Sequence, residues 1–508
     1  MSPMRWTSPM FLFATLLVTP VAVAGEPAAP SGGEGVAAAA SPGNADLRGD
    51  DPEAEAQAYL DAWNKEGAPV CAKRDAGCEA KGELLWKAAA QFEAARRRDK
   101  AMGVRKLILD PRFHLESTAY GKKAAFELAQ DYQSIAEYAE AAALHEAAAQ
   151  RFPAEAPAPD GLLEAVTLRL GLGDLDRATE DAEVFDKLYG AKRSAQAVKL
   201  RLGIVAFLID KEAFGEARGR LERLMARIDR DGDLGDRIQA HAWLGRSLAK
   251  LDDAKRAERE YGIVRALWKE PQVAMKALAG AGDGDAAQAR RLGNALTAVG
   301  EAIFFFAEKK RVELDAIRYP IYKGPATREQ ISAHVGTQVA GWIRKKREAI
   351  EATEGAYREV LALQPAPPPR WVIASGARVG QMWGKFVAEF RAAPIPREWM
   401  GNRPAAGPSD MSNGALRSFY YQQVDAASEP LKQRARGAFA TCVDHARKFQ
   451  FFDEHVRSCE VWLAKNYGAE FSLVAELRPA LGGYGWSLRA SPAGEAVQAR
   501  RPERPASP

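Results

Sequence analysis

The chain has 508 residues, of which 27% are charged and 47% hydrophobic, and its formal net charge is only +4. Such a small and mixed charge gives no support for nucleic-acid binding, which requires a concentrated basic face. Beyond the N-terminal apolar run, no stretch approaches the ~18 apolar residues that a membrane helix needs. We therefore expect no membrane span in the mature chain.

The N-terminus has the pattern of a secretory signal. Arg5 precedes a short apolar run, Met10 to Thr19, and Ala22-Val23-Ala24 forms a small-residue cleavage site. Residues 1–24 are therefore predicted to be a cleavable signal peptide, which implies a periplasmic mature protein. Residues 25–50 are rich in alanine, glycine, proline and serine, which predicts a flexible leader.

The segment from Ala125 to Pro153 has the pattern of two antiparallel helices. Small or apolar residues recur at helical spacing in its first part, and a second helix begins near Ala141 after a short turn. The small residues Ala129 and Ala141 suit a close crossing of the two helices, because larger side chains would push them apart. This segment resembles the tetratricopeptide repeat (TPR), a helix-turn-helix unit with small residues at the crossing and a closing proline.

The same pattern recurs along the first half of the chain. The second-helix alanines of the five copies are Ala101, Ala141, Ala178, Ala217 and Ala257. They are spaced by 40, 37, 39 and 40 residues, somewhat more than the usual 34 of the family. We therefore predict an all-α fold in which residues 51–270 form a TPR-like solenoid of antiparallel helix pairs; the alternative is an irregular helical bundle.

The second half lacks a clear repeat. Residues 271–393 are predicted to be an irregular region of longer helices, among them one at about 286–310 and one at about 328–363. The proline-rich residues 394–414 predict a linker, and residues 415–480 a C-terminal helical hairpin whose first helix starts at Ser428-Glu429-Pro430. Residues 489–508 predict a disordered tail.

The four cysteines form two local pairs, Cys71 with Cys78 and Cys442 with Cys459. An exported protein favours disulfides at such pairs. Cys442 and Cys459 lie at similar distances from the aromatic turn around Gln450, so they face each other in an antiparallel hairpin. A zinc site built from Cys442, His445, His455 and Cys459 is the alternative, since these are ligand types that zinc prefers.

We find no G-x-S-x-G, H-E-x-x-H or P-loop pattern, and predict neither catalysis nor a cofactor. Solenoids of this kind present a concave groove lined by the first helix of each repeat. The repeat register predicts that groove residues, suited to an extended peptide or a partner helix, are Phe126, Gln130, Gln133, Thr167, Gln239, Ala242, Arg246 and Lys250.

Two runs in the second half, Pro367 to Phe386 and Phe451 to Tyr467, resemble periplasmic TPR proteins of myxobacteria, some of which belong to the adventurous gliding machinery. That resemblance implies a structural role in a cell-envelope assembly, with other envelope proteins or peptides as partners. An assembly factor for outer-membrane or secreted proteins, and a zinc protein or enzyme using the Cys/His cluster, are the alternatives. The sequence leaves the partner and the oligomeric state open.

Overall fold

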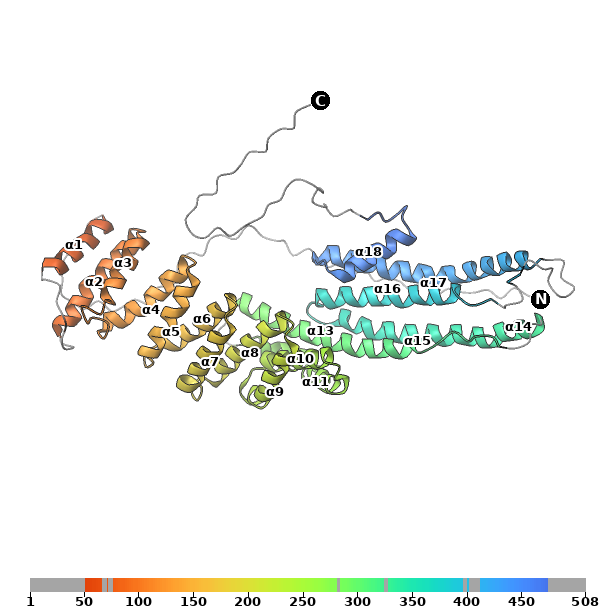
Figure 1. Ribbon diagram of the computed structural model, residues 1–508, viewed down its shortest axis with the longest axis horizontal. Coiled ribbons are helices and arrows are strands. Elements are labelled where there is room, and N and C mark those ends of the chain that lie inside the picture. Colours follow the sequence, from red (N-terminus) through yellow and green to blue (C-terminus); the bar gives the residue numbers. More distant parts are fainter. Residues whose placement is uncertain are drawn as a thin grey trace, which may run out of the picture.

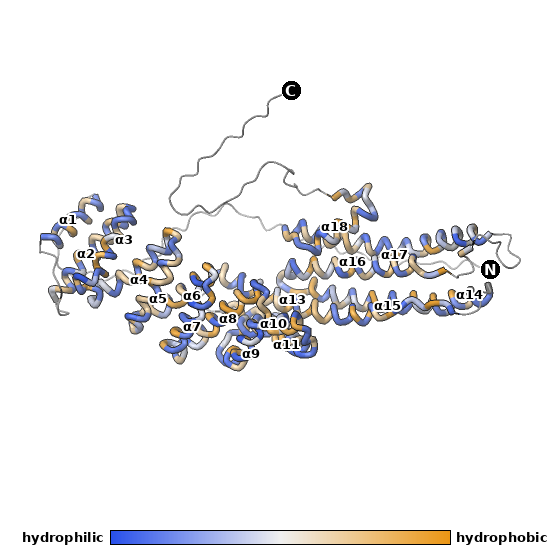
Figure 2. Tube along the Cα trace, viewed as in Figure 1, coloured by the Kyte–Doolittle hydropathy of each residue, from blue (hydrophilic) through white to orange (hydrophobic). Residues whose placement is uncertain are grey.

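The computed structural model describes residues 51–65, 71, 76–280, 284–323, 328–395, 400–401 and 412–473. The predicted signal peptide, the leader, the terminal tail and most of the predicted linker lie outside these residues. Within the described part, the chain is an elongated row of helices that ends in a bundle of longer helices (Figure 1). Hydrophilic and hydrophobic residues are interspersed along each helix (Figure 2). In this part of the chain no helix is both long and apolar enough to cross a membrane.

The first half is a series of helix pairs preceded by α1 (Pro52–Lys65). The first helix of each pair packs antiparallel on the second, and each pair packs on the next. The pairs are α2 (Ala76–Ala94) with α3 (Arg98–Ile108), α4 (Ala119–Ser134) with α5 (Tyr138–Arg151), α6 (Ala158–Gly171) with α7 (Leu175–Tyr189), α8 (Ser194–Asp210) with α9 (Phe214–Asp231), and α10 (Leu234–Lys250) with α11 (Ala254–Leu267).

The crossings of these pairs confirm the repeat register. All five second-helix alanines are fully buried, with 0% of their surface exposed: Ala101, Ala141, Ala178, Ala217 and Ala257. A larger side chain at such a crossing would separate the two helices. The fold of this half is therefore the predicted all-α, TPR-like solenoid.

The turn inside each pair repeats as closely as the crossing does. The residue five positions before the alanine has a positive φ in every copy: Arg96 (58°), Ala136 (64°), Gly173 (80°), Glu212 (56°) and Asp252 (62°). The next backbone N–H donates to the carbonyl five residues earlier, at 2.7–3.0 Å, for example from Glu137 to Tyr132. This left-handed cap with its long-range bond is the Schellman motif. It ends each first helix at the same place relative to the crossing.

Exchanging glycine and alanine at these turns is expected to shift stability in opposite directions. Ala136 is exposed and holds a left-handed conformation that costs an L-residue about 1–2 kcal/mol. Ala136→Gly should therefore raise the free energy of unfolding by about 0.5–1 kcal/mol after the entropy of the unfolded glycine is subtracted. Gly173→Ala should lower it by a similar amount, as measured by urea unfolding. A change of the same sign in the free energy of unfolding of both variants would contradict the left-handed conformation of these turns.

The second half contains the longest helices of the described chain. After α12 (Pro271–Leu278), α13 runs over Asp285–Asp315, beyond the predicted end at about 310. The predicted helix at 328–363 is present as α14 (Arg328–His334), a π-helical turn η1 (Val335–Val339), α15 (Ala340–Arg358) and a 3-10 turn η2 (Glu359–Ala362). The remaining helices are α16 (Pro369–Arg391), α17 (Asn413–Phe449) and α18 (Glu454–Asn466).

The predicted helix start at Ser428-Glu429-Pro430 is wrong. Helix α17 begins at Asn413, where the Ser412 hydroxyl accepts from the backbone N–H of Ala415 at 3.2 Å, and Pro430 lies inside it. An interior proline costs an isolated helix ~3 kcal/mol. Extensive packing of α17 on α16 offsets that cost, and this packing is invisible to a local sequence pattern.

A stripe of three glycines brings α16 close to the two last helices. A side-chain carbon at Gly380 would lie 2.7 Å from the Phe439 ring on α17, and one at Gly384 would lie 3.2 Å from Trp462 Nε1 on α18. At Gly376 it would meet Cys442 at 3.3 Å. Because α16 and α17 share one hydrophobic core, the predicted linker joins two neighbouring helices of one bundle.

Both predicted disulfides are confirmed. Cys71 is bonded to Cys78, and Cys442 to Cys459, with Cα–Cα distances of 5.8 and 6.6 Å. The second bond ties α17 to α18 within the core. It also uses both thiolates that the zinc alternative needs, and no group of three or more candidate ligands lies together in the described residues. The zinc alternative is therefore not supported.

Candidate functional site

The first helices of the repeats lie on the inner side of the solenoid. Helices α2 and α4, α6 and α8, and α8 and α10 are in direct contact. Consecutive second helices are instead bridged by long side chains, Arg227 to Asp186 at 2.9 Å and Arg256 to Glu222 at 2.6 Å. A row of pairs whose first helices are closer together curves toward them, so the first helices form the concave face.

Two rows of residues run along this face, one from each first helix in turn. In the first four copies, a small or uncharged residue occupies the position eleven residues before the second-helix alanine: Ala90, Gln130, Thr167 and Ala206. Eighteen residues before it stand residues of alternating charge: Glu83, Lys123, Asp160 and Lys199. The members of both rows are exposed or half-buried. The concave face therefore has a low, uncharged floor beside a charged edge.

The structure places five of the predicted groove residues at the surface of α4, α6 and α10. Gln130 and Thr167 are exposed, and Gln239 is half-buried. Gln133 is half-buried and donates from Nε2 to Glu164 at 3.4 Å, which joins α4 to α6. Lys250, at the end of α10, is exposed and lies over the Phe214 ring at 5.8 Å.

Three other predicted groove residues are not available to a partner. Phe126 is 5% and Ala242 0% exposed; the Phe126 ring lies against Gly161 of α6, where an added side-chain carbon would be 3.7 Å from it. Arg246 donates from Nε to the buried Glu301 of α13 at 2.7 Å. Helix α13 covers α10 where a further repeat would otherwise begin, so Arg246 joins the solenoid to the bundle.

The prediction missed the most distinctive contact on the face. Lys123 of α4 lies over the rings of Trp86 and Tyr120, at 5.8 and 5.4 Å. Lys123 holds the same register position as Gln239, eighteen residues before the alanine. Applying the position of Gln239, eighteen residues before the alanine, to the other copies would have identified Lys123.

Two charged edge residues are held between neighbouring repeats. Asp160 accepts from Arg193 at 3.3 Å, and Lys199 pairs with Asp233 at 3.1 Å. Burial lowers the pKa of Lys199, but the hydrogen bond and charge of Asp233 outweigh it, so its pKa is raised. Lys199 therefore stays charged at neutral pH.

A buried carboxyl group lies behind the face, between three helices. Asp181 of α7 is 4% exposed, next to Glu146 of α5, which accepts from Arg169 Nε of α6 at 2.7 Å. Burial raises the pKa of Asp181 to about 7, the neighbouring Glu146 adds to this, and Arg169 and Arg177 oppose it. The folded protein therefore binds a proton here that the unfolded chain has released.

Stability should consequently fall as pH rises through this window. An unfolded aspartic acid loses its proton near pH ~4, whereas folded Asp181 keeps it until about pH 7, so unfolding becomes easier between these values. Asp181→Asn should remove the effect and stabilise the protein at pH ~8 on the order of 2 kcal/mol, with little change at pH ~4. Thermal unfolding across this range measures it, with Glu183→Gln, exposed on the same helix, as control. If Asp181→Asn leaves the pH dependence of stability unchanged, Asp181 is not the group that holds the proton.

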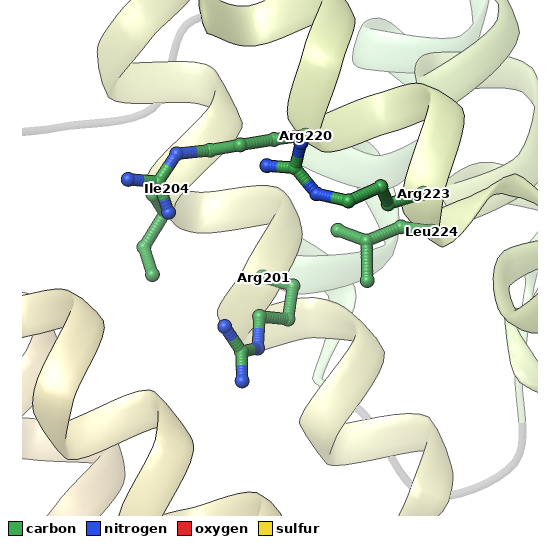
Figure 3. A pocket seen from close by; sticks show the side chains of 5 residues that line it. All are labelled: Arg201, Ile204, Arg220, Arg223 and Leu224. Atoms are coloured by element: carbon green, nitrogen blue, oxygen red, sulfur yellow. The ribbon is translucent and has the colours of Figure 1, made fainter.

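Between α8 and α9, three arginines surround a small cavity of about 80 Å³. Figure 3 shows Arg201, Arg220 and Arg223 gathered beside Ile204 and Leu224. Arg201 donates to Asp186 at 2.7 Å and Arg220 to Glu216 at 2.9 Å. Two of the three guanidinium groups already bind carboxylates, so these arginines mainly hold α7, α8 and α9 together.

No family model matches the sequence, and no curated protein matches it. Similar solved structures include YrrB, described as a TPR protein with an unusual peptide-binding site; the match has 16% identity and covers 44% of this chain and 98% of that one, with a TM-score of 0.27. TPR-like repeats of a putative kinesin light chain from Podosopora anserina match at 15% identity over 38% and 97%, with a TM-score of 0.27. BtubC from P. vanneervenii matches at 14% identity over 46% and 93%, with a TM-score of 0.28. At such TM-scores these likenesses carry no argument, so the fold rests on the chain's own repeat geometry.

Proposed function

We propose that this protein is a non-catalytic scaffold that binds an extended segment of another protein along its concave face. The observation that supports this most is the pair of rows on α2, α4, α6 and α8. Small or uncharged residues such as Gln130 and Thr167 allow a backbone to approach closely. Charged residues such as Lys123 and Asp160 can select for oppositely charged side chains of the bound segment.

The signal-peptide pattern and the resemblance to myxobacterial TPR proteins support a narrower proposal. We infer a periplasmic, structural component of a cell-envelope machine, such as that for gliding motility. Two disulfides are compatible with an oxidising compartment. An assembly factor for outer-membrane or secreted proteins is the alternative, since it would use the same face for unfolded clients.

Blocking the floor of the groove should strongly weaken partner capture without unfolding the protein. Gln130→Arg with Thr167→Arg adds two long charged side chains at exposed positions, and we expect capture from crosslinked envelope extracts to fall about tenfold. The matched control, Ala147→Arg with Gln150→Arg, adds the same charge at exposed positions of the second helix α5. It should leave capture unchanged.

The identity of the captured proteins separates the two roles. A small fixed set of folded envelope proteins supports a scaffold, whereas many unfolded outer-membrane or secreted clients support an assembly factor. Equal capture by the groove variant and the wild type would show that the concave face is not the binding surface.

A further inference from the structure

The end of the bundle that lies away from the solenoid carries a concentrated positive charge. Residues 310–347 hold nine lysines and arginines against three acidic residues, a formal net charge of +6, whereas the whole chain has +4. The described residues of this segment form the end of α13, the connection after it, α14, η1 and the start of α15. Figure 1 shows them at the far end of the elongated molecule.

Contacts along the connection bring the two halves of this segment together. Lys346 of α15 donates from Nζ to the carbonyl oxygen of Ile317 at 3.1 Å. Nearer the tip, His334 of α14 donates from Nε2 to the carbonyl oxygen of Pro320 at 3.2 Å. Residues 317–320 therefore run beside α15 and α14, so cations far apart in sequence share one end of the bundle.

Most of these cations are not neutralised within the protein. Arg311 and Lys346 pair with Glu308 and Glu389, at 2.8 and 3.0 Å. The exposed cations that form no ion pair with any described residue are Lys310, Arg318, Lys323, Arg344, Lys345 and Arg347. A positive charge that the fold itself does not use therefore faces solvent at this end, and it can attract an anionic surface.

An aliphatic side chain is exposed within this positive region. Ile321 is 64% exposed and lies between Arg318 and Lys323 in sequence; Val335, which follows His334, is 48% exposed. A phospholipid surface offers anionic headgroups to cations and, just below them, hydrocarbon to an aliphatic side chain. An acidic protein surface would match the charge alone, so the combination favours a membrane.

We propose that this end of the bundle docks on a membrane that contains anionic phospholipids. The exposed lysines and arginines face the headgroups, and the Ile321 side chain enters the interface beneath them. The solenoid lies at the other end of the molecule (Figure 1), so its concave face stays open to a partner. This docking surface does not depend on the proposed role of the solenoid.

The test measures co-sedimentation of the full chain with vesicles. One set contains phosphatidylcholine alone, and the other an equimolar mixture of phosphatidylcholine and phosphatidylglycerol. The protein should bind the mixed vesicles far more tightly, and added salt should weaken this binding because exposed charges are screened. Arg344→Glu with Arg347→Glu should weaken it at least about tenfold, and Arg344→Gln with Arg347→Gln by a smaller factor.

Matched variants separate this surface from a general effect of charge or of surface polarity. Lys255→Glu with Arg259→Glu makes the same charge change at exposed positions of α11 and should leave binding unchanged. Ile321→Asp should weaken binding to the mixed vesicles several-fold. Val273→Asp is its control, because Val273 of α12 is 61% exposed and lies outside the positive region. Circular dichroism should show all variants folded.

Three results would overturn the proposal. The first is equal binding to the two kinds of vesicle. The second is an equal loss in the α15 and α11 charge variants, which would show a general charge effect. The third is wild-type binding by Ile321→Asp, which would leave a purely electrostatic contact and make an acidic protein surface an equally good partner.

Discussion

Replacing Arg105 with methionine is expected to lower the free energy of unfolding of the first repeats by about 3–5 kcal/mol. Arg105 is 2% exposed; its Nη1 donates to Asp131 at 2.6 Å, and its Nη2 pairs with Glu93 at 2.7 Å. It therefore joins α2, α3 and α4 through buried charge. Without it, Asp131 remains a buried carboxylate that has lost its hydrogen-bonded cation. Hydrogen exchange should show early opening of α3 and α4.

The pH dependence of this variant provides an internal check. Burial raises the pKa of Asp131, and the charge of Arg105 opposes that. Once Arg105 is gone, Asp131 takes up a proton more readily, so the stability deficit should shrink as pH falls. Arg105→Met with Asp131→Leu should recover most of the loss, because both buried charges are then removed.

An exposed ion pair supplies the control. Arg447 pairs with Asp444 at 3.7 Å, and the two side chains are 69% and 73% exposed. Arg447→Met should therefore change the free energy of unfolding by less than ~1 kcal/mol. A similar loss in both arginine variants would mean that burial of Arg105 is not the cause.

Removing the disulfide of the bundle is the second large effect expected. Cys442→Ala with Cys459→Ala opens a bond between residues 17 apart in sequence. The chain-entropy model gives a loss of about 3 kcal/mol. Urea unfolding of the double variant should therefore shift in the same direction as that of the reduced wild type. Adding reductant to the double variant should cause no further loss of stability from this site.

Two further measurements separate this role from metal binding. Protein purified from an oxidising compartment should show no reactive thiol at Cys442 or Cys459 and no stoichiometric zinc. Reactive thiols together with one zinc per chain would contradict the disulfide. Cys71→Ala with Cys78→Ala is a useful comparison, because its residues are 7 apart and the same model gives a smaller loss.

The solenoid was predictable because its signals are local. The spacing of Ala101, Ala141, Ala178, Ala217 and Ala257 sets where each pair of helices crosses, and a crossing depends on side-chain size at that one place. The cysteine pairs were equally local. For Cys442 and Cys459, similar distances from one turn are enough to place them opposite each other.

The groove residues were only partly predictable. A register identifies the face of the first helix, but not which positions on it the neighbouring helices cover. Phe126 and Ala242 occupy a covered position, and Arg246 is taken by Glu301 from α13, far along the chain. Lys123 was missed although the register reaches it, because the contact with Trp86 joins two repeats.

The sequence by itself therefore determined the helix pairs, their order and the two cysteine pairings, because each depends on residues close together in the chain. Only the tertiary structure decided that α17 continues through Pro430. Only the tertiary structure, too, packs both α15 and α17 on α16. Both features depend on how helices distant in sequence pack together, and no local pattern encodes that packing.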